Sequence, residues 1–376
     1  MKFVVSSSDL LRRLNAISRV ISSKSTIPVL DNILFEFQDN ALQLTASDLE
    51  TTLITSLETD LLDGEGKIAI PAKIIIDTLK EFAEQPLSFT IDTETFGIEI
   101  RTETGKFSIA GQSGDDFPLL PKLDPEKCIA FKVGHDALLE GINKTIFATA
   151  DDELRPVMNG ILVELTPEDM TFVASDAHKL VRYRRKDAQA EIEASFILPK
   201  KPASLLRNLL PKEDLDVAVN FDEKNAFFEL TNFRLVCRLV EGKYPSYNSV
   251  IPINNTNRII VDRLDFYNTL KRVSVFSNQA SQLVKLKLTP TEMVVSAQDI
   301  DFSISAVEHL ACAYEGHEME IGFKASFLLE ILSNLSTPEI KMELADPTRA
   351  GLLLPAEDEM EDEDVLMLLM PMMINV

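Results

Sequence analysis

The sequence repeats itself with a spacing of 128 residues, and this repeat limits the possible folds more than any other feature of the chain. Three pairs of matching segments carry it: residues 28–36 and 156–164, residues 44–48 and 172–176, and the prolines Pro71 and Pro199. In the first pair, Pro-Val leads through a polar pair into an apolar run that ends in Glu. Three independent matches at one spacing indicate one structural unit that the chain contains more than once.

An aromatic residue or Met that precedes Pro marks the end of each unit and points to a third copy. The markers are Phe117-Pro118, Tyr244-Pro245 and Met370-Pro371. Each unit reads as strand, helix, several strands, helix, several strands. We therefore expect an α+β fold of three tandem similar domains, at residues 1–126, 127–256 and 257–376. The segment 244–252 then joins the second domain to the third.

Hydrophobic periodicity predicts where the main elements lie. Apolar residues at helical spacing predict helices at residues 10–21, 72–83, 136–147, 263–276 and 325–335, with a further helix after Pro199-Lys200. Ser8 or Asp9 is the predicted N-cap of the first helix. Alternation of polar and apolar residues predicts a strand from Asp299 to Ile304.

The composition is that of a folded protein of the cytoplasm. Hydrophobic residues make up 45% of the 376 residues, which is enough to build substantial cores. The three cysteines are odd in number and widely spaced, as expected of reduced thiols. The N-terminus turns polar at Ser6, unlike a signal peptide, and the apolar run 365–374 is shorter than the roughly 20 residues of a membrane span. We expect a soluble protein without a membrane partner.

The distribution of charge matters more than its sum. A net charge of -23 argues against a conventional nucleic-acid binder with a basic surface. The predicted helices or their entries nevertheless carry bases: Arg12, Arg13, Arg19, Lys73, Lys80, Lys144, Lys200, Lys201, Arg207, Arg263, Lys271, Arg272 and Lys324. These bases are either an ordinary solvated face or the lining of a channel that surrounds a polyanion. Residues 357–364 include seven acids and are predicted to form a solvated loop tip, with partner binding as the second interpretation.

Catalytic and metal-binding patterns are weak in this sequence. Ser175-Asp176 with His178 nearby suggests a catalytic group, but the matching Ser47-Asp48 has no His, so a turn cap explains both pairs better. His309, Cys312 and His317 do not have the spacing of a usual zinc site. The sequence contains neither a Walker-type loop nor a dinucleotide fingerprint. We therefore predict a protein without catalytic activity or cofactor.

Taken together, the motifs resemble those of the bacterial sliding clamp family, the beta subunits of DNA polymerase III. The segments that carry the resemblance over essentially the whole chain are 1–3, 28–34, 47–50, 159–160, 175–180, 244–247, 250–252, 320–323 and 370–372. The resemblance implies three domains of the DNA-clamp type, with helices lining the inside and antiparallel sheets outside, that close into a ring as a head-to-tail homodimer. Such a ring encircles duplex DNA without reading its sequence and tethers the replicative polymerase.

The resemblance also implies partners and a location. The polymerase alpha subunit, the clamp loader, other polymerases and repair proteins bind such clamps through short peptides. The setting is the bacterial cytoplasm, with association to the nucleoid during replication. The alternative is a scaffold of repeated domains that binds replication partners but forms no ring. A dimer retained on circular DNA distinguishes the clamp from the scaffold.

Two sets of site residues follow from the resemblance by position. The peptide pocket consists of Ser175, Ala177, His178, Lys179, Leu180, Pro245, Ser249, Val250, Thr348, Ala350, Met370, Pro371 and Met372. The DNA-contacting residues are Lys24, Lys73, Arg155, Lys200 and Lys201. Without the resemblance, Leu180, Val250 and Met370 are equally well explained as core residues, and the five bases as ordinary exposed charges.

Overall fold

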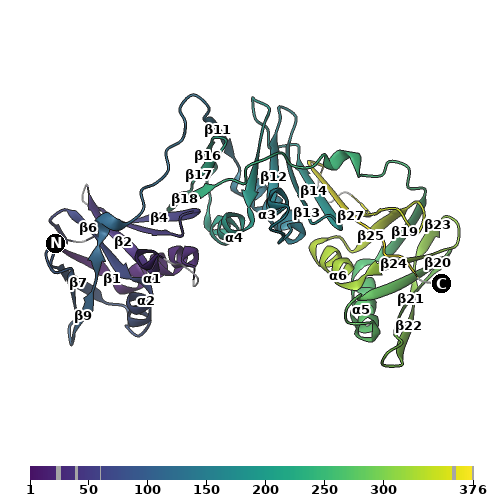
Figure 1. Ribbon diagram of the computed structural model, residues 1–376, viewed down its shortest axis with the longest axis horizontal. Coiled ribbons are helices and arrows are strands. Elements are labelled where there is room, and N and C mark those ends of the chain that lie inside the picture. Colours follow the sequence, from purple (N-terminus) through teal and green to yellow (C-terminus); the bar gives the residue numbers. More distant parts are fainter. Residues whose placement is uncertain (23–26, 39–40, 60, 358–360, 375–376) are drawn as a thin grey trace. The chain divides into compact units, whose positions relative to one another are not determined.

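The computed structural model of the chain describes residues 1–22, 27–38, 41–59, 61–357 and 361–374. These residues form six α-helices and four antiparallel sheets (Figure 1). The chain separates into two compact units, residues 1–136 with 201–239 and residues 137–200 with 240–376. The second of the three predicted domains therefore contributes to both units. The predicted boundaries after residues 126 and 256 stay predictions.

Unit 1 contains two sheets and three helices. Its strands are β1 (Lys2–Ser6), β2 (Asn32–Gln38), β3 (Ala41–Ser47), β4 (Thr51–Glu58), β5 (Leu61–Asp63), β6 (Gly66–Pro71), β7 (Pro86–Ile91), β8 (Gly97–Arg101), β9 (Lys106–Ala110), β10 (Gln112–Ser113), β11 (Ile129–Val133), β16 (Val217–Phe221), β17 (Asn225–Glu229) and β18 (Phe233–Arg238). One sheet has the order β5-β1-β7-β8-β9 and the other β10-β6-β2-β3-β4-β18-β17-β16-β11. The helices are α1 (Ser7–Ile17), α2 (Ala72–Lys80) and α4 (Lys200–Leu209), whose first residue belongs to unit 2.

Unit 2 has the same kind of construction. Its strands are β12 (Gly160–Leu165), β13 (Met170–Ser175), β14 (Lys179–Arg185), β15 (Ala194–Pro199), β19 (Asn257–Asp262), β20 (Leu283–Thr289), β21 (Glu292–Asp299), β22 (Ile304–Ala311), β23 (Ala313–Glu315), β24 (Met319–Lys324), β25 (Glu339–Leu344), β26 (Gly351–Pro355) and β27 (Glu363–Leu369). The sheet orders are β15-β12-β13-β14-β27-β26-β25-β19-β23 and β22-β21-β20-β24. The helices are α3 (His135–Thr145, with its first two residues in unit 1), α5 (Arg263–Val273) and α6 (Ala325–Asn334).

The predicted repeat is confirmed by the order of the elements. Strand, helix, strands, helix and strands follow one another three times, beginning with β1-α1, β11-α3 and β19-α5. Pro28 and Pro156 each begin a short 3-10 helix, η2 (Pro28–Asp31) and η5 (Pro156–Met158). The first leads directly into β2, and the second ends one residue before β12 begins. Proline fits the first turn of a helix because the N–H groups there have no helical acceptor. Pro71 and Pro199 each end a strand directly before α2 and α4.

A turn closed by an aspartate follows the same strand in all three copies. The Oδ1 atom of Asp48 accepts hydrogen bonds from the N–H groups two and three residues later, at 3.1 and 2.7 Å. Asp176 does the same at 2.9 and 2.8 Å, and Asp299 at 3.0 and 3.3 Å. The next residue of the first two turns, Leu49 or Ala177, has a positive φ of 77° or 74°. The prediction that the Ser-Asp pairs cap turns is thus confirmed.

The predicted strand from Asp299 to Ile304 is wrong. Asp299 ends β21, residues 300–303 form a turn, and β22 begins at Ile304. The Asp299 side chain hydrogen-bonds the backbone locally, which competes with a strand ladder. Ile300 and Phe302 are therefore 79% and 71% exposed rather than half-buried.

The ends of the first helix also differ from the prediction. Ser6, not Ser8 or Asp9, is the N-cap of α1, and its Oγ accepts a hydrogen bond of 3.1 Å from the backbone N–H of Asp9. The α-helix ends at Ile17, and a 3-10 turn, η1 (Ser18–Val20), completes the predicted helical segment. In the third copy, the 3-10 turn η8 (Ser274–Phe276) follows α5 in the same way.

The last two acids of the acidic run do not lie in a loop tip, which corrects the prediction for residues 357–364. Glu363 and Asp364 begin β27. Asp364 lies 2.9 Å from Arg182 and Glu363 lies 3.6 Å from Arg185, both on the neighbouring strand β14. Cross-strand ion pairs of this kind hold two strands in register. Residues 358–360 of the run lie outside the described residues.

Two of the three unit markers are core aromatics. Phe117 packs with Val29, Leu30 and Leu34 in unit 1. Tyr244 packs in a larger cluster of unit 2, whereas Met370 is 42% exposed. Within the described residues, no helix has the length and apolar character of a membrane span.

We predict that Asp299→Ala lowers the stability of the β21–β22 hairpin by about 2 kcal/mol, because two backbone N–H groups lose a buried carboxylate acceptor. Native-state hydrogen exchange of the β21 and β22 amides measures the change. Asp301→Ala removes an exposed carboxylate from the same turn and is the matched control. Equal exchange rates in the two variants would contradict the role of the turn.

Candidate functional site

The predicted peptide-pocket residues come from four separate segments of unit 2. These are the turn between β13 and β14, the junction 244–252, and the loop before β26 together with the end of β27. Strands β14 and β27 are antiparallel neighbours, with Lys179 opposite Leu369. The N–H of Met370 continues this pairing and donates to the backbone oxygen of His178 at 2.9 Å. The structure thus brings the second-domain turn and the end of the chain together.

A shared apolar cluster joins the junction to the two strands. Leu180 is buried in this cluster, and Ala350 packs against its edge. Its other members include Tyr244 and Tyr247 of the junction. Leu180 is therefore a core residue. Val250 and Met370 are 56% and 42% exposed, so both offer apolar surface to a ligand.

The remaining pocket residues form local backbone contacts or lie at the surface. The Ser175 hydroxyl donates to the backbone oxygen of Lys179 at 2.9 Å and accepts from the N–H of Ala177 at 3.2 Å. Ser249 donates to the backbone oxygen of Ser246 at 2.6 Å, and Thr348 to the Asp346 carboxylate at 2.6 Å. The other positions are exposed Pro245, half-buried Pro371, and Met372, whose N–H donates to the backbone oxygen of Gly322 at 2.8 Å.

A buried lysine beside these residues links the turn to α6. The Nζ atom of Lys179 lies 2.8 Å from Asp176 and 3.0 Å from Glu330, and only 5% of its side chain is exposed. It also lies 4.4 Å above the ring of Phe327, on which the His178 ring stacks at 5.9 Å. Burial favours the neutral carboxyl of Asp176, but hydrogen bonds from Lys179 and His178 outweigh it and lower its pKa. The sequence did not point to Phe327 or Glu330, because their partners are more than 140 positions away.

A second polar contact holds the junction. The Tyr247 hydroxyl donates to the Glu164 carboxylate on β12 at 2.5 Å. Burial, followed by this hydrogen bond and the charge of Glu164, raises the pKa of Tyr247 to about 12. The only feature of the sequence that marks this contact is Glu164 itself, which ends the repeated segment. In the first copy the matching Glu36 instead accepts a hydrogen bond from Gln43 at 3.3 Å.

Three of the predicted DNA-contacting bases already have acidic neighbours. Arg155 pairs with Asp152 at 2.8 Å, Lys200 with Asp151 at 2.8 Å, and Lys201 with Asp48 at 2.5 Å. Lys201 also donates to the backbone oxygen of Val20 at 2.6 Å. Lys73 is exposed on α2, and Lys24 lies outside the described residues. The contacts of these five residues with DNA stay a prediction.

The residues that suggested catalysis have structural partners. The Ser175 hydroxyl and the Asp176 carboxylate both bond to the backbone of their own turn. His309 lies 2.9 Å from Glu292. Across the described ranges, no group of three or more His, Cys, Asp or Glu residues is arranged to hold a metal ion.

Comparison with known proteins assigns the chain to a family. Models of the N-terminal, central and C-terminal domains of the DNA polymerase III beta subunit match residues 1–121, 132–246 and 248–373. The chain is 27% identical to the beta sliding clamp of Vibrio cholerae over 99% of both chains, and 28% identical to that of Synechococcus elongatus over 94% of this chain and 96% of the relative. The chain belongs to the DNA polymerase III beta subunit family.

Solved clamp structures share its fold. The sliding clamp of Bartonella birtlesii has a TM-score of 0.91 at 26% identity, and the beta subunit of Thermotoga maritima has 0.89 at 26% identity, each over the full length of both chains. The fold is thus that of three tandem clamp domains, and the function is that of a DNA sliding clamp that tethers the polymerase. This favours the clamp over the alternative of a scaffold without a ring.

We predict that Tyr247→Phe removes from the absorbance titration one phenol that ionises near pH 12. Because folding raises this pKa, the stabilisation is complete below about pH 10 and is lost as the pH rises through 12. The variant is expected to lose about 2 kcal/mol of stability at pH 7, since Glu164 loses a buried donor. Urea unfolding measures the loss, with Tyr267→Phe on α5 as the control. A Tyr247→Phe titration identical to that of the wild type would contradict the assignment.

Proposed function

We propose that two copies of this chain close head to tail into a ring around duplex DNA. Consecutive repeats already join through strand pairs, β4 with β18 in unit 1 and β14 with β27 in unit 2. By its place in the repeat, β22 corresponds to β4 and β14, and β9 corresponds to β18 and β27. Both β22 and β9 are edge strands of their sheets. If β22 of one copy pairs with β9 of the other, the contact between consecutive repeats occurs a third time. This pairing removes both edges and closes the ring.

The side chains on these two edges support the pairing. Val307 on β22 is 59% exposed, and Ile304 on β22 and Phe107 on β9 are exposed as well. Apolar side chains on an edge strand are an aggregation hazard unless another chain covers them. The charged residues at these edges, Lys106 on β9 and Glu308 on β22, already pair within their own units, with Glu99 at 2.5 Å and with Arg272 at 2.6 Å, so the support comes from the apolar side chains.

Retention on DNA in this proposal depends on topology. The net charge of -23 opposes strong binding to the DNA backbone, whereas exposed bases on the helices, such as Lys73, offer contacts that do not depend on base sequence. A ring that surrounds the duplex stays on it without high affinity. A clamp loader and the polymerase alpha subunit are the proposed partners of this ring.

We predict that the wild-type chain is a dimer, twice 42.0 kDa, and stays on nicked circular DNA after loading until the circle is cut. Val307→Lys places a charge among the exposed apolar side chains of the proposed β22–β9 contact and is expected to give a 42.0 kDa monomer that is not retained. Multi-angle light scattering and gel filtration of the loaded circles measure both properties. Leu119→Lys changes an exposed loop residue and is the control.

Equal binding of wild type to linear and circular DNA, or partner binding without retention, would favour the non-ring scaffold. A dimeric Val307→Lys variant would reject the edge pairing but not the ring.

The second part of the proposal is that short peptides of the polymerase alpha subunit, the clamp loader, and other polymerases and repair proteins bind at the pocket residues. Val250 and Met370 offer exposed apolar surface, and the buried cluster under them holds that surface in place. Methionine adapts to varied ligands because its side chain is unbranched and polarizable. The Bartonella birtlesii clamp was solved bound to griselimycin, so a relative of the same fold holds a ligand.

We predict that deletion of residues 370–376 abolishes binding of a clamp-binding peptide of the alpha subunit and leaves the dimer intact. Met370→Ala alone is expected to weaken binding about tenfold, because it removes a half-exposed apolar contact. Isothermal titration calorimetry measures the affinity, and Met373→Ala, three residues along the same tail, is the control. Unchanged affinity in the deletion variant would reject this pocket.

In this proposal the chain has no catalytic activity of its own. It works in the bacterial cytoplasm, near the nucleoid during replication. The Ser-Asp pairs serve as turn caps, which supports a non-catalytic role. The cysteines Cys128, Cys237 and Cys312 are free thiols, which suits a reducing compartment.

A further inference from the structure

The sheet β22-β21-β20-β24 of the third repeat has one face that points away from its helices (Figure 1). Helices α5 and α6 pack on the opposite face, where the side chains of Val284, Leu286 and Val295 are buried. Successive side chains of a strand point to opposite faces, so Lys285 and Lys287 on β20 lie on the face away from the helices. We call this face the outer face of the third repeat.

The internal repeat identifies the matching face of the second repeat. Asp176 and Asp299, which close the matching turns, are 123 residues apart, and the same spacing separates Leu162 on β12 from Lys285 on β20. The strand registers agree with this match. The residues opposite on the two neighbouring strands are Val173 and Ile197 in the second repeat and Ser296 and Gly322 in the third.

In the second repeat, the chain itself covers this face. Tyr244 and Tyr247 of the junction 244–252 pack in one buried cluster with Leu162 and its neighbours on the sheet. The Tyr247 hydroxyl also donates to the carboxylate of Glu164 at 2.5 Å. A short peptide segment thus binds the face through apolar contacts and one hydrogen bond to an acid of the sheet.

Lysines replace the residues that hold the junction when the third repeat is reached. Lys285 stands in the place of Leu162, and Lys287 stands in the place of Glu164. The Lys287 side chain is exposed and forms no ion pair with any residue that the structure describes. Glu320 on β24 lies opposite Lys287 and 3.7 Å from the Nζ atom of Lys285, so two lysines share this carboxylate. The replacements change the face from an acceptor of apolar groups and a hydroxyl to one that favours anions.

A cavity of about 560 Å³ adjoins Lys285 and has room for an apolar side chain. Ile300 and Met373 line it and are 79% and 81% exposed, so a ligand that covers them buries apolar surface. The acids of the lining, Asp299 and Asp301, belong to the turn after β21. The anionic groups of a ligand are therefore expected at the lysines and its apolar side chain at the cavity.

We infer that the outer face of the third repeat binds a short acidic peptide segment of a partner protein, in the place that the junction takes on the second repeat. Lys285 and Lys287 lie about 7 Å apart along one side of β20, which matches carboxylates at alternate positions of an extended peptide. An apolar side chain two positions further along fills the cavity. This surface is separate from the candidate peptide pocket, and its existence does not depend on the ring.

The probe is a labelled synthetic peptide, Ser-Glu-Ser-Glu-Ser-Leu-Ser, and fluorescence anisotropy at low salt measures its binding to the full-length protein. Lys285→Gln with Lys287→Gln is expected to weaken binding about tenfold, because two exposed ion pairs are lost. The control, Lys186→Gln with Lys243→Gln, removes the same charge from exposed positions of unit 2 outside this face. Equal affinities of the two double variants, or no binding by the wild type, would overturn the inference.

A double-mutant cycle tests which groups meet. A peptide with Gln in place of both Glu residues is expected to lose about tenfold on the wild type and little on the Lys285→Gln, Lys287→Gln variant, because the same ion pairs are already absent. Losses that multiply would place the acids of the peptide elsewhere and contradict the assignment. Lys285→Glu with Lys287→Glu is expected to prefer a peptide with Lys in place of Glu, and an unchanged preference would reject the face.

Competition separates this surface from the other proposed sites. A saturating clamp-binding peptide of the alpha subunit and a short linear duplex are each expected to leave the probe bound. Displacement by the first would assign the probe to the candidate pocket, displacement by the second would make the face a DNA site, and either result rejects the inference. Light scattering and retention on circular DNA test the ring by itself. A retained dimer in which the lysine variants do not change probe binding would leave the proposed function standing without this surface.

Discussion

Backbone pairing between the strands of consecutive repeats is the interaction on which the rest of this structure depends. The β4–β18 and β14–β27 pairs turn short sheets into nine-stranded ones and bring distant segments together. The β14–β27 pair places the turn that follows Asp176 next to Met370, which creates the candidate peptide site. The same rule leaves β9 and β22 as edge strands, which are the two strands that the proposed ring pairs between copies.

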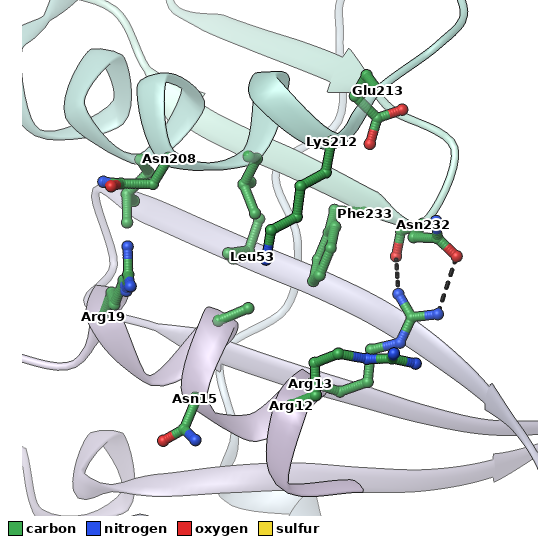
Figure 2. Close-up of a pocket in the computed structure, with 13 residues that line it drawn as sticks. Arg12, Arg13, Asn15, Arg19, Leu53, Asn208, Lys212, Glu213, Asn232 and Phe233 are labelled. Carbon is green, nitrogen blue, oxygen red and sulfur yellow. Dashed lines mark hydrogen bonds between the residues drawn. The ribbon is translucent and has the colours of Figure 1, made fainter. Parts of the chain in front are cut away.

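Charge is organised around this framework rather than spread evenly. Several acids are used inside the protein: Asp48 and Asp176 close turns and bind Lys201 and Lys179, and Asp364 pairs with Arg182 across two strands. These pairs neutralise bases that the sequence alone presents as available. The cleft beside α1 (Figure 2) is lined by Arg12, Arg13, Arg19 and Lys212, and the carboxylate of its lining, Glu213, accepts a hydrogen bond from the backbone.

Much of the candidate site could be predicted from the sequence, but not its internal contacts. The recurring Ser-Asp pairs predicted the turn caps, because a local hydrogen bond depends only on neighbouring residues. The contacts of Lys179 with Glu330 and of Tyr247 with Glu164 join residues 151 and 83 positions apart, and no local pattern marks them. The predicted strand from Asp299 to Ile304 was wrong because the Asp299 side chain hydrogen-bonds the backbone of its own turn. The alternation of polar and apolar residues does not show this competition with strand pairing.

The sequence by itself determined the threefold repeat, the order of strands and helices, the turn caps and the presence of bases on the helices. These features depend on periodicity and short-range hydrogen bonds, which each segment carries locally. Only the tertiary structure decided that the strands of the second repeat divide between two sheets, and which cations find acidic partners. Backbone pairing between strands uses N–H and C=O groups that every residue except proline possesses, so the choice of partner strand leaves no residue pattern in the sequence.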